Sequence, residues 1–224
     1  MGNNIQIAID GPAAAGKSTI AKLVAEELGY TYIDTGAMYR AITYKVLERH
    51  IDLENEEALT NLLLETTIEL KPSNDGQMVF LDGQDVSDAI RSNAITSYVS
   101  IVASKASLRK EMVNRQIKMA KRSGVVMDGR DIGTHVLVEA ELKIFMSASV
   151  DERAKRRQLD NERRGIDSLL SQLKKEIVLR DKMDSERVAS PLVQAKDAIY
   201  LDTTNLTILE AAKYIIQLAK ERMS

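Results

Sequence analysis

A lysine and two hydroxyl side chains follow a glycine-bounded loop near the start of the chain. Residues 11–18 fit the pattern G-x-x-x-x-G-K-[ST], whose backbone N–H groups cradle phosphate oxygens. The glycines allow close approaches that a Cβ would block. Lys17 would reach the β- and γ-phosphates of a nucleoside triphosphate, and the Ser18 hydroxyl would bind Mg²⁺. We expect the triphosphate to contact Gly11, Pro12, Ala13, Ala14, Ala15, Gly16, Lys17, Ser18 and Thr19.

Two further groups of acids and arginines each follow a short apolar run. Residues 34–40 read DTGAMYR, and residues 128–131 read DGRD. Ligands of parallel α/β sheets bind beyond the carboxyl ends of the strands, so we expect both groups on the side of the phosphate loop. Asp128 closes a Val-Val-Met run and is suited to hold Mg²⁺, directly or through water. Arginine suits phosphate because its planar guanidinium grips two oxygens at once.

Alternating strands and helices would position these groups. Residues 5–10 are an expected strand, residues 18–28 a helix that stops at Gly29, and residues 30–33 a second strand. Residues 36–47 and 208–223 have helical periodicity, and residues 124–128, 142–146 and 198–202 are short buried strands. This order predicts an α/β fold with a five-stranded parallel sheet flanked by helices.

The middle of the chain has a different pattern. Residues 55–64 favour a helix, whereas residues 67–71 and 77–81 alternate with period two, with turn residues at 73–76 and 82–83. We expect an antiparallel hairpin inserted at about 64–88. Residues 92–121 favour two helices broken near Ser104, and residues 151–182 form a charged helical stretch. The chain is interpreted as one domain, 1–224, with a core of residues 1–63, 89–150 and 183–224.

Composition excludes several classes of function. The 224 residues contain no cysteine, which excludes disulfides, thiolate nucleophiles and cysteine-ligated zinc. The net charge of −2, two Phe and no Trp favour neither a nucleic-acid partner nor base stacking. No apolar run approaches membrane-spanning length, and no signal segment precedes the first strand. We expect a cytoplasmic monomer that binds no nucleic acid and no membrane.

Four motifs, taken together and in order, resemble the bacterial cytidylate kinase family. They are Asp-Thr-Gly-Ala-Met-Tyr-Arg at 34–40, Asp-Gly-Arg-Asp-Ile-Gly-Thr at 128–134, the arginine and acid run at 180–187, and Pro191-Leu192 with the segment 197–203. The resemblance covers essentially the whole chain. It implies a P-loop nucleoside monophosphate kinase that transfers the γ-phosphoryl group of ATP to CMP or dCMP with Mg²⁺.

The resemblance also implies roles for individual residues. Arg40 and Arg130, with Thr35, would hold the monophosphate, while Ser100, Arg109 and Asp131 would read the cytosine edge. Arg180 and Asp184 would hold the pentose, and Arg187 would lie near the base or phosphate. The catalytic group would be Lys17, Asp128, Arg130 and Arg180. Residues 151–182 look like the lid over ATP, with Arg153 and Arg157 as its contacts.

Simpler interpretations remain open for several of these residues. Thr35 could cap a helix from Gly36, Arg40 could be solvated, and Asp184 and Arg187 could pair on a helix surface. The lid arginines could form an ordinary charged face. For the whole chain, the alternatives are a P-loop kinase for another monophosphate or for shikimate, and a nucleotide switch or nucleic-acid ATPase. No Asn-Lys-x-Asp guanine-reading motif occurs.

Overall fold

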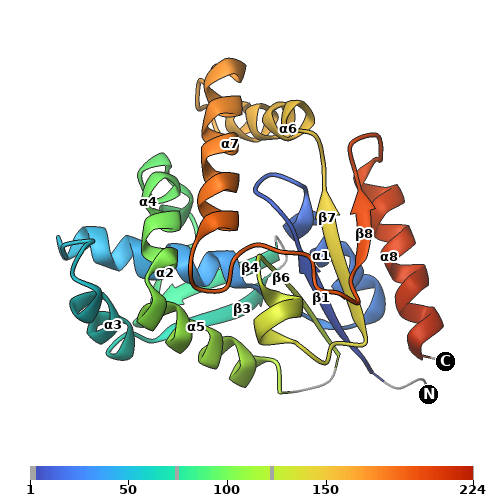
Figure 1. Cartoon of the computed structure of the whole chain (residues 1–224), viewed down its shortest axis with the longest axis horizontal. Helices are drawn as coiled ribbons and strands as arrows, with labels where there is room; N and C mark the ends of the chain where they lie inside the picture. The colour runs from blue at the N-terminus through green and yellow to red at the C-terminus, as the bar shows by residue number, and fades with distance from the viewer. Residues whose placement is uncertain (1–3, 74–75, 122–123, 224) are drawn as a thin grey trace.

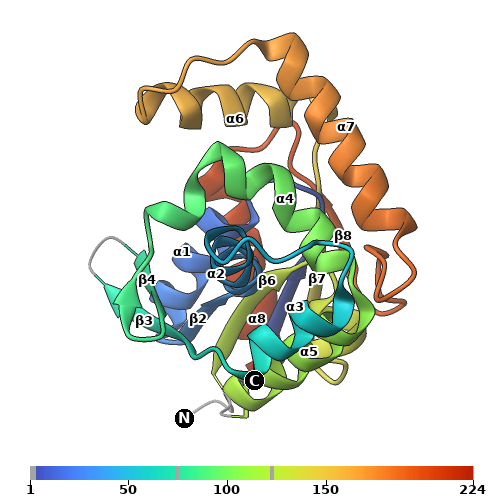
Figure 2. The same cartoon turned by 90° about the vertical axis from the view of Figure 1, so that its left-hand side faces the viewer.

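A five-stranded parallel sheet forms the centre of the computed structural model, which describes residues 4–73, 76–121 and 124–223. The strand order is β2-β6-β1-β7-β8. Figure 1 labels β6, β1, β7 and β8, and Figure 2 labels β2. The strands are β1 (Gln6–Asp10), β2 (Thr31–Asp34), β6 (Val125–Gly129), β7 (Leu142–Ser147) and β8 (Ile199–Asp202). The parallel five-stranded sheet predicted from the sequence is confirmed, and its carboxyl ends meet at one edge.

Helices cover both faces of this sheet. On one face, α1 (Lys17–Leu28) and α8 (Ile208–Met223) bury Ile20, Val24 and Ile215 against the isoleucines of β1. The other face carries α2 (Thr35–Glu48), the short turn η2 (Ile132–Val136) and α5 (Ala106–Met119). Gly16 and Gly29, both with positive φ, bound α1. The helix therefore begins at the phosphate loop and ends where the sequence pattern predicts.

A second cluster of apolar side chains joins the helices beside the sheet. It packs α2 against α3 (Glu56–Leu64), α4 (Asn93–Ser104) and α5, with Ile42, Leu59, Val102 and Leu108 fully buried. The predicted break near Ser104 is confirmed, because Lys105 has extended backbone between α4 and α5. A short 3₁₀ turn, η1 (Ala89–Arg91), leads into α4.

The inserted segment is an antiparallel sheet of three strands, one more than the expected hairpin. β3 (Ile68–Ser73) and β4 (Gly76–Leu81) pair as predicted, and β5 (Gln84–Asp85) adds a short third strand. Asp82 and Gly83 both have positive φ, which suits the tight turn between β4 and β5. Of the other predicted turn, Asn74 and Asp75 lie outside the described residues. The sequence does not predict β5 because a strand of two residues is too short to show an alternation of apolar and polar residues.

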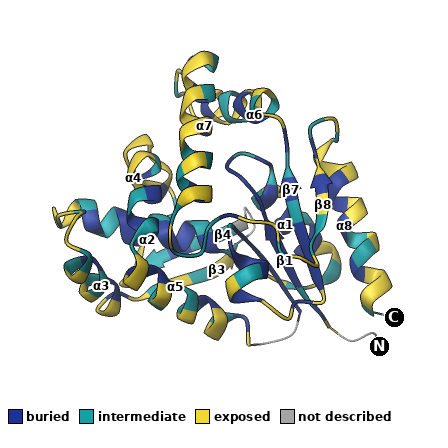
Figure 3. Cartoon of the chain, viewed as in Figure 1, coloured by how far each residue is buried: buried dark blue, intermediate teal, exposed yellow. Residues whose placement is uncertain are grey.

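Two helices rise from the body beyond the carboxyl edge of the sheet. They are α6 (Val150–Arg163) and α7 (Leu170–Glu186). In Figure 1 α7 stands upright with α6 beside its upper end, and in Figure 2 α6 lies across the top while α7 descends on the right. Ala154, Leu173 and Ile177 join them in a small apolar cluster of their own. Much of their surface is exposed, in contrast with the buried strands below (Figure 3).

Candidate active site

The phosphate loop is held against the sheet by its backbone. Gly11 has a φ of 151°, and a Cβ there would collide with the carbonyl oxygen of Met146 on β7. Ala14, in the left-handed region with a φ of 58°, and Gly16, at 90°, complete the turn into α1. The N-terminus of α1 points at the cleft, so its N–H groups and dipole favour an anion there.

Lys17 is buried beneath this loop. Its Nζ donates to the carbonyl oxygen of Pro12 at 2.7 Å, and only 5% of the residue is exposed. Burial, together with the positive charge of Arg130, lowers the pKa of Lys17 to about 7, although Asp128 and Asp10 oppose the shift. Bound phosphate would favour the charged form of this amine.

Asp128 anchors the hydroxyl groups around the expected metal position. Its Oδ2 accepts from Ser18 at 2.8 Å, and its Oδ1 accepts from Tyr32 at 2.7 Å. Burial, with the nearby charge of Asp34, raises the pKa of Asp128 to about 6. The Ser18 hydroxyl of α1 and the Asp128 carboxylate of β6 therefore meet at the start of α1.

Thr35 does not cap α2, so that interpretation is wrong. Asp34 is the cap: its carboxylate accepts from the Ala37 N–H at 2.9 Å. The Thr35 hydroxyl instead donates to the backbone carbonyl of Asp128 at 2.7 Å, which ties the start of α2 to β6. A Cβ on Gly129 would lie 2.6 Å from the Thr35 hydroxyl, so the close approach of the two loops requires glycine.

A chain of ion pairs links most of the residues expected to hold the acceptor. Arg130 Nε lies 2.8 Å from Asp184 Oδ2, and Arg109 Nη2 lies 3.0 Å from Asp131 Oδ1. Arg187 lies 3.8 Å from both Asp131 and Asp184, and its Nε donates to the carbonyl of Ser190. The interpretation of Asp184 and Arg187 as a surface pair is wrong, because both are buried.

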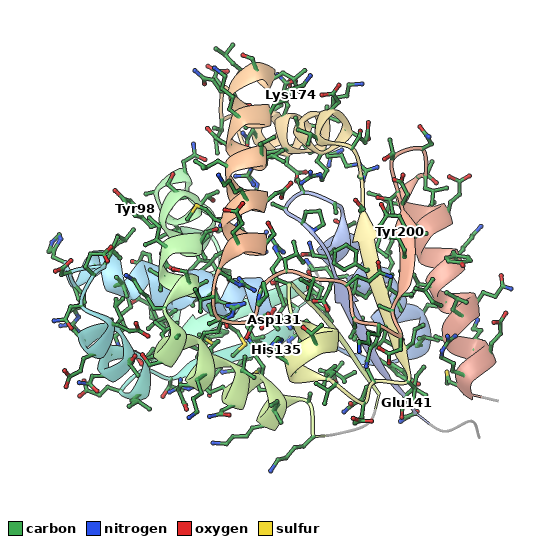
Figure 4. The ribbon with its side chains drawn as sticks, in the orientation of Figure 1. Tyr98, Asp131, His135, Glu141, Lys174 and Tyr200 are labelled. Carbon is green, nitrogen blue, oxygen red and sulfur yellow. The ribbon has the colours of Figure 1, made fainter. Side chains whose placement is uncertain are left out.

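The Arg109–Asp131 pair lies inside the molecule, where Figure 4 places Asp131 beneath the lower end of α7. The two residues are 2% and 3% exposed. Arg109 also donates to the carbonyl of Ala103 at 3.0 Å and lies over the Tyr39 ring. Asp131 Oδ2 has no hydrogen-bond partner among the described residues. Ser100 is buried on α4, one turn before Ala103, and shares its face.

Arg40 and Arg180 are partly buried, and both line the cleft. Burial lowers the pKa of Arg40 to about 9, with the charge of Arg180 as a second cause. Burial likewise lowers the pKa of Arg180 to about 10, with Arg130 as the second cause. Arg40 therefore is not a solvated helix residue; its Nη1 donates to Thr96 on α4 at 3.0 Å.

The three lid arginines nearest the loop have different environments. Arg153 is fully engaged: it pairs with Asp181 at 2.7 Å and donates to the carbonyls of Ala13 and Ala148. Arg156 donates to the carbonyls of Ala15 and Thr203. The guanidinium of Arg157 has no such partner within the described residues, and it faces the cleft.

These groups surround one cleft of about 390 Å³, a size typical of small-ligand sites. It contains residues of both expected halves: Ala13 to Thr19 and Arg157 for the triphosphate, and Arg40, Arg130 and Arg180 for the acceptor. Gly11, Pro12 and Arg153 do not line it. Thr35, Ser100, Arg109, Asp131, Asp184 and Arg187 do not line it either; several adjoin it through the ion pairs above.

The sequence matches the family model of cytidylate kinase over residues 7–221. The chain belongs to the cytidylate kinase family. A cytidylate kinase from Lysinibacillus sphaericus (strain C3-41) is 64% identical over 223 residues, which cover 100% of both chains. One from Bacillus cytotoxicus is 59% identical and covers 100% of this chain and 99% of its own. One from Geobacillus sp. (strain WCH70) is 58% identical over 100% of both.

Sequence reasoning missed one residue of this cytidylate kinase family member. Asp10 ends β1 and accepts hydrogen bonds from the backbone that follows Asp131. The sequence signal that could have identified it is its place as an acid at the end of a strand, immediately before the phosphate loop. Arg156 was expected only as one of the lid arginines, and the structure adds its hydrogen bond to the carbonyl oxygen of Ala15 in the phosphate loop.

Within the described ranges, no helix of this family member is both long and apolar enough to cross a bilayer.

Proposed function

We propose that this enzyme transfers the γ-phosphoryl group of ATP directly to CMP or dCMP in a cleft shared by both substrates. The observation that carries the proposal is the meeting of the phosphate loop with Arg40, Arg130 and Arg180 in that one cleft. The loop suits the triphosphate of ATP, and the three guanidiniums suit the phosphate of the acceptor.

The acceptor arginines are arranged for a multiply charged anion. Besides burial, the charge of Arg180 lowers the pKa of Arg40, and the charge of Arg130 lowers that of Arg180, so a phosphate that enters among these cations would stabilise their charged forms. Arg130 differs, because its contact with Asp184 outweighs burial and raises its pKa. Its ion pair with Asp184 fixes its position, so it can hold the acceptor in line with the γ-phosphoryl group.

Lys17 would stabilise the negative charge that moves from donor to acceptor. Its Nζ is held by Pro12 at the base of the loop, where the β- and γ-phosphates of ATP would lie. The acceptor oxygen is already an oxyanion, so the transfer needs no strong general base. Lys17, Arg130, Arg180 and the lid arginines supply charge and position, and no covalent enzyme intermediate is required.

The residues present fit Mg²⁺. Ser18 and Asp128 contribute a hydroxyl and a carboxylate 2.8 Å apart, and Mg²⁺ is commonly held by such oxygen donors together with water and substrate phosphates. Ser18 would bind the ion directly, and Asp128 through water. The ion would neutralise charge on the β- and γ-phosphate oxygens.

Asp131 would select the base. Its free Oδ2 can accept from the exocyclic amino group of cytosine, which uracil replaces with a carbonyl oxygen. Arg109, Ser100 and Arg187 would complete the base contacts, and Asp184 with Arg180 the pentose contacts. Residues 151–182 would act as a lid over ATP on a single domain, with Arg157 as its ATP contact. We place the enzyme in the cytoplasm as a monomer.

The test is ADP production from Mg·ATP with CMP, dCMP, UMP, AMP, GMP and shikimate. Strong turnover with CMP and dCMP and weaker turnover with UMP is expected. Turnover with another monophosphate only would retain the phosphate sites and overturn the base-reading roles. ADP release that needs no acceptor would favour an ATPase and overturn the proposal.

A further inference from the structure

Asp10 joins the two halves of the site. It is the last residue of β1, immediately before the phosphate loop, and is 5% exposed. Its Oδ1 accepts from the Ile132 N–H at 2.8 Å, and its Oδ2 accepts from the Gly133 N–H at 2.7 Å. The Asp10 carboxylate, beside the phosphate loop, therefore fixes the backbone that follows Asp131 on the acceptor side.

These two N–H groups begin the short turn η2, so Asp10 caps η2 from a neighbouring strand. Aspartate in the N-cap position commonly caps its own helix. Asp131 occupies that position for η2 but makes no such side-chain hydrogen bond. It pairs with Arg109 through Oδ1, and its Oδ2 is unpartnered among the described residues. Asp10 occupies the donors that would otherwise compete for the Asp131 carboxylate.

We propose that Asp10 is a positioning residue for base selection: by capping η2 it keeps the Asp131 carboxylate available to the acceptor. This rests on the proposed function, in which Asp131 reads cytosine. In Asp10→Asn the amide oxygen can accept from one N–H, while the amide nitrogen faces the other. The freed N–H then draws the Asp131 carboxylate back onto its own turn.

The test is a double-mutant cycle on selectivity at pH 8. The ratio of kcat/KM for CMP to that for UMP, with saturating Mg·ATP, is measured for the wild type, Asp10→Asn, Asp131→Asn and the double variant. We expect Asp10→Asn to lower the ratio about tenfold and Asp131→Asn at least as much. The double variant should have the same CMP to UMP ratio as Asp131→Asn, because without the Asp131 carboxylate the Asp10 substitution has nothing to misplace.

Asp202→Asn is the matched control. Asp202 also ends a core strand, and its carboxylate accepts from the backbone N–H of Thr204 at 2.9 Å, but it is exposed on β8. The same substitution there should leave the CMP to UMP ratio unchanged. A fall in this control equal to that in Asp10→Asn overturns the inference.

The outcomes separate the two proposals. An unchanged ratio in Asp131→Asn overturns the base-reading role of Asp131. A reduced ratio in Asp131→Asn with an unchanged ratio in Asp10→Asn overturns only the role of Asp10, as does a double variant in which the two losses add. If Asp10→Asn does not fold, Asp10→Glu replaces it, because its extra methylene must displace η2. A wild-type ratio in that variant also overturns the inference.

Discussion

Arg130 and Asp184 form an ion pair, with 2.8 Å between Nε and Oδ2, that connects the end of β6 to the end of α7. The upper part of α7 packs against α6 above the cleft. At its lower end, Asp184 holds Arg130, which lines the cleft where the acceptor would bind. Any movement of α7 as a rigid helix would therefore move Arg130 or break its ion pair with Asp184.

Arg130→Lys should lose most of its turnover and keep its affinity for ATP. A lysine replaces a planar fork with a point charge and cannot hold both Asp184 and a phosphate oxygen in the same geometry. We expect kcat to fall by about 10²-fold, the scale seen when one preorganised charge donor is removed. Steady-state kinetics and ATP titration measure the two effects, and near-normal turnover would contradict the role of Arg130.

Asp184→Asn should raise KM for CMP by about tenfold, because it removes the charge that holds Arg130 in place and leaves the KM for ATP nearly unchanged. Asp181→Asn is the matched control: Asp181 lies one turn earlier on α7 and pairs with Arg153 rather than Arg130. It should change thermal stability but not the KM for CMP. An equal rise in the KM for CMP in both variants would show that the effect comes from general destabilisation of α7 and not from the contact with Arg130.

Arg157→Gln and Arg153→Gln should have opposite consequences. Arg157 faces the cleft, so its loss should raise the KM for ATP several-fold with little change in melting temperature. Arg153 is buried in contacts with Asp181 and two carbonyls, so its loss should lower stability by about 1–3 kcal/mol. Calorimetry and ATP kinetics on both variants test this, and an unchanged KM in Arg157→Gln would exclude it as an ATP contact.

Asp10 should make stability depend on pH. Burial, opposed by its two backbone hydrogen bonds and by Lys17 and aided by Asp131, raises the pKa of Asp10 to about 6 from an ordinary 3.8. The folded state then binds the proton more tightly than the unfolded state. The contribution is fully present below about pH 4 and is lost as pH rises through about 6, on the order of 3 kcal/mol.

Urea unfolding of the wild type and Asp10→Asn between pH 4 and 7.5 measures this contribution. The free energy of unfolding of the wild type should fall relative to the variant as pH rises through that range. Parallel curves would contradict a raised pKa for Asp10.

The sequence alone predicted most of the fold and singled out candidate residues for the site. Local signals sufficed there: short apolar runs for the core strands, period-two alternation for β3 and β4, Gly29 for the end of α1, and the Gly11 to Ser18 spacing for the phosphate loop. These patterns depend on neighbours within a few residues, which sequence displays directly. It also indicated that the groups at 34–40 and 128–131, which include Arg40 and Arg130, lie at one edge of the sheet, because parallel strands bring their carboxyl ends together.

Only the tertiary structure decided which partner each side chain has. Thr35 bonds to β6 instead of capping its own helix, and Asp10 caps a turn more than 120 residues away. Arg153 is committed to the protein while Arg157, four residues on, faces the cleft. A polar group that leaves water must find a partner, and the nearest one is set by how distant segments pack, so spacing along the chain cannot name it.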